Sequence, residues 1–162
     1  MNEPKWMTRA RRYLGLRETP GKATTPTIAR WLRELNAWWA DDATPWCGVF
    51  VAAVMRNEGF KAPPHWYRAR AWLNFGVGIE EPVPGCIAVF ERGGAGHVGF
   101  VVGTDERGRL MILGGNQGDA VTIAPFDKSR VLGYRYPQGE KVLAGSLPLL
   151  ASNGTPSSHN EA

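Results

Sequence analysis

The sequence predicts an α+β fold, because its helical patterns precede its strand patterns along the chain. Apolar residues recur at helical spacing up to about residue 74. From Val83 onward the period shifts to two, and glycine-rich turns separate short apolar runs. No strand-helix-strand alternation is present, so we expect N-terminal helices packed on an antiparallel sheet of roughly five strands.

The first half of the chain contains four predicted helices, three of them with recognisable end signals. Thr25 and Thr44 are expected N-caps, and each precedes a proline, which suits the first turn of a helix. Gly59 is expected to end the third helix as a C-terminal cap. The second and third helices carry an apolar stripe that should face the core. The four patterns cover residues 4–16, 25–35, 44–58 and 65–74.

The second half contains five short segments of period two, each bounded by turn residues: CIAVFE, HVGFVVG, RLMILG, AVTIAP and VLGYRY. Five such segments in succession predict an antiparallel meander. The end of the chain is rich in Ser, Asn, Gly and Pro, which is typical of a disordered segment. We therefore expect a folded domain over residues 1–137 and a flexible tail over residues 138–162.

The composition is that of a basic globular protein, with 162 residues, a net charge of +4 and a pI near 9.3. A basic surface favours anionic partners without choosing among them. The arginines and lysines are scattered and no nucleic-acid-binding motif is present, so nucleic acid is not an expected partner. No stretch approaches the roughly 20 apolar residues of a spanning helix, and the N-terminus shows no signal-like apolar run. We expect cytoplasmic synthesis, no stable membrane insertion, a monomer, and two free thiols.

Cys47 and His97 are the residues best suited to covalent chemistry. Cys47 lies near the start of a predicted helix, where unpaired N–H groups and the helix dipole stabilise a thiolate and should lower the thiol pKa. His97 begins an apolar strand after a glycine-rich turn, so its ring can face a cleft. A cysteine on a helix start and a histidine on a strand form the pair that cysteine-based acyl transfer needs.

Asn116, in the turn GGNQGD, is the expected partner that orients His97. Its side-chain oxygen can accept the Nδ1–H of His97 and leave Nε2 facing sulfur. The turn itself also favours an asparagine, so a purely conformational role is the alternative. Asp119 is the reserve candidate for the orienting partner.

Four segments taken together resemble the CHAP-type amidohydrolase/peptidases of the papain-like superfamily: TPWCGVFVAAVM, PVPGCIAVFE, GHVGFVVG and ILGGNQGDAV. The resemblance extends from about Trp6 to Tyr136 and is strongest for a small subgroup encoded by phages and bacteria. It implies a papain-like fold and a Cys nucleophile, a His base and a polar orienting residue, which correspond to Cys47, His97 and Asn116. Many relatives have Asp where this chain has Cys86, which we interpret as a bystander.

The resemblance further implies a peptidoglycan hydrolase that cleaves a cell-wall amide, either between sugar and peptide or within the peptides. Phages use such enzymes as endolysins to lyse bacteria, and the chain would then act on the wall after release or delivery. An injected antibacterial effector is the alternative biology. The reaction requires neither a cofactor nor a metal, and the predicted partner is bacterial peptidoglycan.

Two further residues are candidates for substrate binding. Trp46, beside the nucleophile, can line the substrate groove or simply pack in the core. Glu18 in RETPG can bind a substrate amine, although a turn-capping role is favoured. Asp41 and Asp42 supply too few oxygen ligands for calcium, which needs about six to eight.

Two rival functions follow from the same residues. A glycosidase-type lysin would use Glu18 as general acid and needs a second carboxylate about 5–9.5 Å away, for which the sequence shows no clear candidate. A non-catalytic wall-binding module would use the basic surface alone. Loss of lysis on thiol alkylation would favour the cysteine enzyme over the glycosidase, and a wall-binding module would release neither new amines nor reducing ends.

Overall fold

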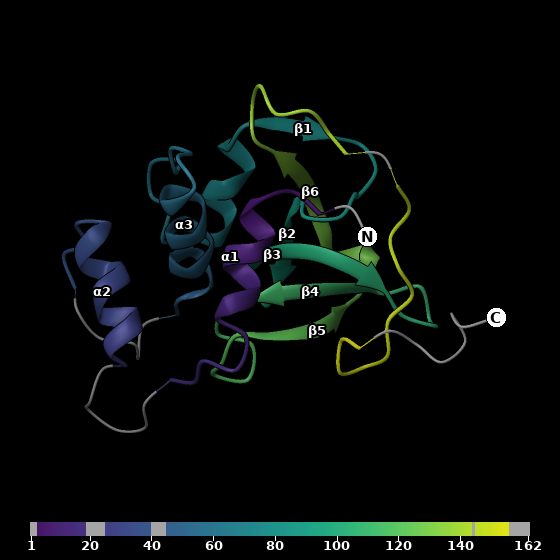
Figure 1. Cartoon of the computed structure of the whole chain (residues 1–162), viewed down its shortest axis with the longest axis horizontal. Helices are drawn as coiled ribbons and strands as arrows, with labels where there is room; N and C mark the ends of the chain where they lie inside the picture. The colour runs from purple at the N-terminus through teal and green to yellow at the C-terminus, as the bar shows by residue number, and fades with distance from the viewer. Residues whose placement is uncertain (1–2, 19–24, 40–44, 144, 156–162) are drawn as a thin grey trace.

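The computed structural model, which describes residues 3–18, 25–39, 45–143 and 145–155, confirms the predicted α+β class (Figure 1). The elements in chain order are α1 (Trp6–Arg12), α2 (Pro26–Glu34), α3 (Cys47–Asn57), η1 (Ala69–Asn74), β1 (Val77–Ile79), β2 (Ile87–Arg92), β3 (Ala95–Thr104), β4 (Leu110–Gly114), β5 (Thr122–Phe126), η2 (Lys128–Arg130) and β6 (Val131–Tyr136). The two η elements are short 3₁₀ helices.

The sheet has six strands in the order β1-β6-β2-β3-β4-β5, and its neighbouring strands are antiparallel. The predicted meander is therefore correct only for β2 to β5. The chain then crosses back so that β6 pairs with β2, and β1 pairs with the outer side of β6. The extra strand β1 has only three residues, too few to show a period of two in the sequence.

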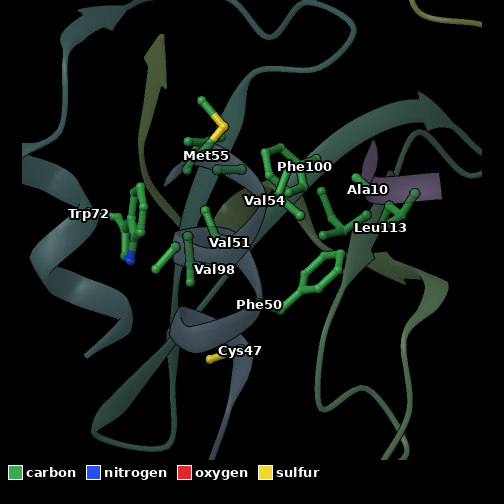
Figure 2. Close-up of a cluster of buried hydrophobic side chains, with 14 of the residues drawn as sticks. Ala10, Cys47, Phe50, Val51, Val54, Met55, Trp72, Val98, Phe100 and Leu113 are labelled. Atoms are coloured by element: carbon green, nitrogen blue, oxygen red, sulfur yellow. The ribbon is translucent and has the colours of Figure 1, made fainter. Parts of the chain in front are cut away.

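Helix α3 lies at the centre of the core, because every residue from Cys47 to Met55 is buried. A helix that is apolar all round needs partners on all sides. The sheet strand β3 packs on one side of it, while α1 and α2 pack on others. Figure 2 shows Phe50 and Val54 of α3 beside Phe100 of β3, and the Phe50 and Phe100 ring centroids are 6.1 Å apart. Cys47 lies at the end of this helix, at the edge of the apolar cluster.

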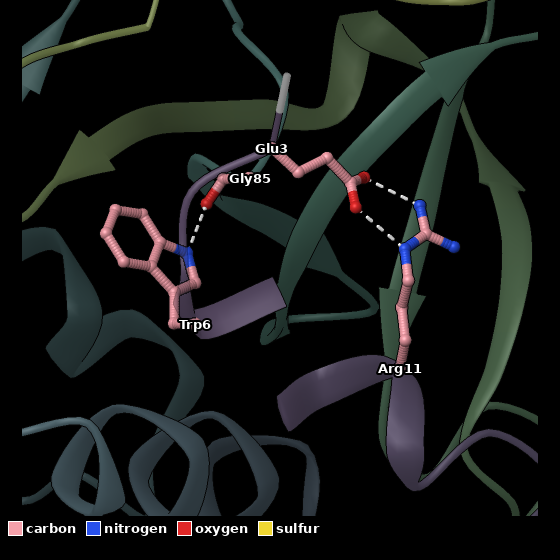
Figure 3. Close-up of polar contacts among 4 residues, drawn as sticks. All are labelled: Glu3, Trp6, Arg11 and Gly85. Atoms are coloured by element: carbon pink, nitrogen blue, oxygen red, sulfur yellow. Dashed lines mark hydrogen bonds and ion pairs between the residues drawn. The ribbon is translucent and has the colours of Figure 1, made fainter. Parts of the chain in front are cut away.

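Helix α1 is tied to the start of β2 by hydrogen bonding (Figure 3). The indole N–H of Trp6 donates to the carbonyl oxygen of Gly85 at 2.9 Å. Arg11 donates twice to the carboxylate of Glu3, at 2.8 and 2.6 Å, which holds the chain before α1 against the helix. Gly85 has a φ of +82°, and a Cβ there would overlap Pro4, so only glycine fits beneath this segment.

Several predicted element ends differ from the structure. The first helix is shorter than predicted, and most of the predicted helix over 65–74 is the 3₁₀ helix η1. Thr25 does not cap α2, since its hydroxyl donates to the carbonyl oxygen of Arg17 instead. Thr44, the other expected cap, lies outside the described residues.

Part of the expected flexible tail is packed on the sheet. The N–H of Leu150 donates to the carbonyl oxygen of Thr104 at 2.7 Å, and the Leu150 side chain is 4% exposed. A Cβ on Gly103 would come within 2.6 Å of Leu150, so this glycine makes room for the leucine. The apolar residues of LPLL thus extend the ordered structure beyond Pro137. None of the helices in the described ranges is long and apolar enough to span a bilayer.

Candidate active site

Cys47 is the first residue of α3 and lies at the wall of a groove of about 690 Å³. One side of the groove is formed by the chain from Pro64 to Ala71, and the other by Gly94 and the first two residues of β3, Ala95 and Gly96. Gly48 permits this arrangement, because a Cβ there would lie 2.5 Å from the carbonyl oxygen of Trp66. The Cys47 side chain is mostly buried, at 8% exposed, and is reached from the groove.

The electrostatic surroundings of Cys47 contain opposing effects. Burial raises the pKa of the thiol above its ordinary value of 9.0 and is the largest effect. Hydrogen bonds from the backbone of Val98, Gly48 and Cys47 itself, together with the charge of Arg92, lower the pKa but do not outweigh burial. The predicted net lowering by the helix N-terminus is therefore wrong for the free protein. The resting form is the neutral thiol, surrounded by groups that would stabilise a thiolate.

The structure brings Cys47 and the segment of His97 together. The sulfur of Cys47 interacts with the backbone of Val98, the residue that follows His97 on β3. Helix α3 packs against β3, so the two candidate residues lie at one junction between helix and sheet. The contact is to the backbone of β3, so the pairing of the Cys47 sulfur with the His97 ring stays a prediction.

His97 is held by Gln117, with 2.9 Å between the histidine Nε2 and the amide Oε1. The amide nitrogen of Gln117 donates to the carbonyl oxygens of Ile112 and Thr122, at 3.1 and 2.9 Å, which turns its oxygen toward the ring. An oxygen acceptor at Nε2 requires that Nε2 carry the hydrogen. In the neutral ring Nδ1 is then the unprotonated nitrogen, which reverses the predicted roles of the two nitrogens.

Two aromatic rings lie beside the His97 ring, those of Phe126 and Phe90. The ring of His97 stacks on Phe126 of β5, with centroids 4.8 Å apart and planes 7° apart. Burial lowers the pKa of His97 to about 4, the Gln117 hydrogen bond opposes this shift, and the charge of Arg92 adds to it. His97 is consequently neutral at pH 7 and able to accept a proton.

Asn116 does not make the predicted hydrogen bond to His97. It has a φ of +58° in the turn after β4, and its neighbour Gln117 makes the contact instead. Gly114 supports this arrangement, because a Cβ there would overlap the amide oxygen of Gln117 and lie 3.3 Å from Nε2 of His97. The turn GGNQGD contains two adjacent amide side chains, Asn116 and Gln117. The sequence does not indicate which of them contacts His97. The reserve candidate Asp119 is exposed and also has a φ of +58°.

The two candidate substrate-binding residues lie away from the groove surface. Trp46 is 1% exposed, and its ring leaves no space for a Cβ on Gly115, so it packs in the core and does not line the groove. The N–H of Glu18 donates to the carbonyl oxygen of Asp119 at 2.7 Å, which joins this segment to the turn after β4. This pairing involves the Glu18 backbone and not its carboxylate, so the turn-capping role of the side chain stays a prediction.

Cys86 precedes β2 and is fully buried, with a pKa raised by burial to about 12. Within the described ranges, no group of three or more His, Cys, Asp or Glu side chains could hold a metal ion. Asp41 and Asp42, weighed above as calcium ligands, lie outside those ranges.

Comparison with known proteins identifies the segment that carries this site. Residues 39–116 match the family model of the CHAP domain, a range that includes Cys47 and His97 and ends one residue before Gln117. No curated protein matches the chain. The match covers α3 and the strands from β1 to β4, which together build the groove and the junction around Cys47. Residues 39–116 are therefore similar to a CHAP domain, which is consistent with a CHAP-type cysteine amidohydrolase or peptidase.

Proposed function

We propose that this protein hydrolyses an amide bond of bacterial peptidoglycan, with Cys47 as nucleophile and His97 as general base. A CHAP domain implies amidase or peptidase activity of the peptidoglycan-hydrolase type. One observation carries the finer proposal: Cys47 lines an open groove while its sulfur interacts with the strand that holds His97. Gln117 fixes His97 in the form that a general base requires.

The proposed cycle begins from a neutral pair, since burial raises the pKa of Cys47 and lowers that of His97. As the sulfur attacks the substrate carbonyl, the thiol proton passes to Nδ1 of His97. The negative charge that develops on the carbonyl oxygen is stabilised by N–H groups at the start of α3. Gln117 accepts from Nε2–H throughout and keeps the ring in one orientation.

The second half of the cycle releases the two products. The imidazolium of His97 protonates the leaving amine as the carbon–nitrogen bond breaks, which leaves a thioester on Cys47. A water molecule, deprotonated by the same ring, attacks the thioester and releases a carboxylic acid. The proton taken from water then passes from His97 to the departing Cys47 thiolate, so the thiol is restored and no cofactor is consumed.

Product analysis on purified cell walls tests this proposal. The protein is incubated with peptidoglycan, and the soluble fragments are identified by mass spectrometry alongside assays for new amines and new reducing sugars. We expect one new amine per cut, no new reducing ends, and no release by a Cys47→Ala variant. Reducing ends would favour the glycosidase mechanism with Glu18, and binding without any fragments would favour the non-catalytic module.

We further propose an endolysin role, in which the protein reaches the wall from the cytoplasm of an infected bacterium. The CHAP domain and the net charge of +4, which suits acidic wall polymers, support this role. Expression in a susceptible host should cause lysis only when a separate membrane-permeabilising protein is also expressed. Lysis without that second protein would contradict the proposed endolysin role.

A further inference from the structure

The charged side chains that line the groove beside Cys47 are all positive. Its positively charged lining side chains are Arg68 and Arg70, and no Asp or Glu lines it among the described residues. A cleft lined by one sign of charge raises the local concentration of ligands of the opposite sign. The groove therefore suits an anionic substrate, and the two arginines differ in how they are held.

The Arg70 side chain connects the two sides of the groove by hydrogen bonding. Its Nε and Nη2 both donate to the carbonyl oxygen of Ala95, at 3.2 and 3.1 Å. Gly96 allows the close approach, because a Cβ there would lie 3.1 Å from the Arg70 side chain. The acceptor is a neutral carbonyl, so the positive charge of Arg70 remains uncompensated while its position is fixed.

Arg68 is exposed and lines the groove without an opposite charge. Its guanidinium lies 5.8 Å from the centroid of the Tyr67 ring, and it forms no ion pair or hydrogen bond through its side chain with the described residues. Other arginines of the chain are paired with carboxylates: Arg9 with Glu58, Arg11 with Glu3 and Arg109 with Asp105. Arg68 thus presents all five of its N–H donors to the groove or to solvent.

We propose that Arg68 binds a carboxylate of the substrate peptide beside the bond that Cys47 attacks, so that the protein prefers acidic wall peptides to their amidated forms. The planar guanidinium matches a carboxylate in a bidentate geometry, which a neutral amide does not reproduce. The guanidinium lies over the ring of Tyr67, the neighbouring groove residue. This inference rests on the proposed function and names the substrate class of the same groove.

The test uses the full chain and two soluble muropeptides that differ only in one side carboxyl group of the stem peptide, free in one and amidated in the other. The wild-type protein should cleave the acidic peptide about tenfold better in kcat/KM, mainly through a lower KM, as expected for a charge-assisted hydrogen bond at an exposed site. Arg68→Gln should remove this preference by raising the KM for the acidic peptide. Arg68→Lys should restore part of the preference, because it keeps the charge and loses the bidentate fork.

Arg56→Gln is the matched control, since Arg56 is exposed at the opposite end of α3 and its loss changes the net charge equally. It should keep the preference for the acidic peptide. The inference would be overturned if Arg68→Gln and Arg56→Gln lost the preference for the acidic peptide equally, or if Arg68→Gln kept it unchanged. Failure of the wild-type protein to cleave either peptide or whole peptidoglycan would instead contradict the proposed function, so the two failures are distinguishable.

Discussion

The two cysteines of this chain have similar burial and opposite surroundings. Cys47 is 8% exposed and Cys86 is 0% exposed, and burial raises the pKa of both thiols. Cys47 lines the groove, and backbone hydrogen bonds and Arg92 act to lower its pKa. Cys86 lies next to Gly85, beneath the segment that leads into α1, and its pKa reaches about 12.

The comparison shows that burial alone does not distinguish the cysteine that we propose as nucleophile from the one that we interpret as a bystander. The difference lies in access and in the groups that can accept a proton nearby. The backbone that contacts Cys47 adjoins His97, whose pKa of about 4 keeps it an acceptor at neutral pH. The titratable neighbours of Cys86 are Tyr134 and Tyr136, whose own pKa values burial raises above 10.0. Phenols of this kind stay protonated and cannot act as bases at pH 7.

The largest expected effect is on activity when the two cysteines are exchanged for alanine. Cys47→Ala should lower the rate of wall hydrolysis by a factor of about 10⁴ or more, because the nucleophile is lost. Cys86→Ala should keep most of the activity and lose stability on the order of 1 kcal/mol, since a fully buried side chain is shortened. Both rates are measured from turbidity of purified walls, with melting temperatures as the folding control. An active Cys47→Ala protein together with a folded, inactive Cys86→Ala protein would reverse the assignment.

The second prediction concerns alkylation of the native protein by iodoacetamide near pH 7.5. Cys47 should react at least about 100-fold faster than Cys86, because it is accessible and the pKa of Cys86 is about 12. His97→Gln should slow the reaction at Cys47, since the proton acceptor is lost, and leave Cys86 unchanged. Peptide mapping by mass spectrometry gives both rates, and the denatured protein should show equal rates. Equal labelling in the native state would remove the distinction between the two sites.

The third prediction concerns stability in acid. The pKa of His97 is about 4 in the folded protein and near 6.5 when unfolded, so the unfolded state binds more protons between these values. Stability therefore falls as the pH decreases from 6.5 to 4, by about 3 kcal/mol from this residue. The difference in free energy of unfolding between the wild type and His97→Gln, measured with urea at pH 7 and pH 4, isolates this contribution from the carboxylates. A difference that stays constant with pH would show that His97 is not held neutral by burial.

The sequence is sufficient to predict the fold class and three of the strand pairings, because these depend on local periodicity. The run from Cys47 to Met55 is apolar enough to mark a central helix, and β2 to β5 follow one another in order. The position of β6 between β1 and β2 is not predictable in this way, since it depends on pairing between strands far apart in the chain. A strand as short as β1 also has too few residues to show an alternation of apolar and polar positions.

For the candidate site, the sequence identifies the residue types but not their electrostatics. Cys47 and His97 stand out by chemistry and by position, and the fold brings the sulfur to the strand of His97. The direction of the Cys47 pKa shift depends on how deeply the helix start is buried, which no local pattern reveals. The choice between Asn116 and Gln117 depends on the path of one turn. Asn116 adopts the left-handed conformation that asparagine tolerates, and the following side chain reaches the ring.

The smallest expected effect tests this turn, and with it the claim that Cys47 has an oriented base where Cys86 has none. Gln117→Ala should lower kcat by about 10- to 100-fold, less than the full contribution of general base catalysis, because His97 remains but its orientation and tautomer are no longer fixed. Asn116→Gly should keep nearly full activity, since glycine accepts a φ of +58° and the hydrogen bond to His97 is made by Gln117.

Gln117→Ala also removes hydrogen bonds to Ile112 and Thr122, so some loss of stability will accompany it. The kcat values at a temperature well below both melting points separate orientation from unfolding. In Gln117→Ala, the loss of kcat should come with slower alkylation of Cys47, which a purely structural role of Gln117 would not produce. A fully active Gln117→Ala protein and an inactive, folded Asn116→Gly protein would return the orienting role to Asn116.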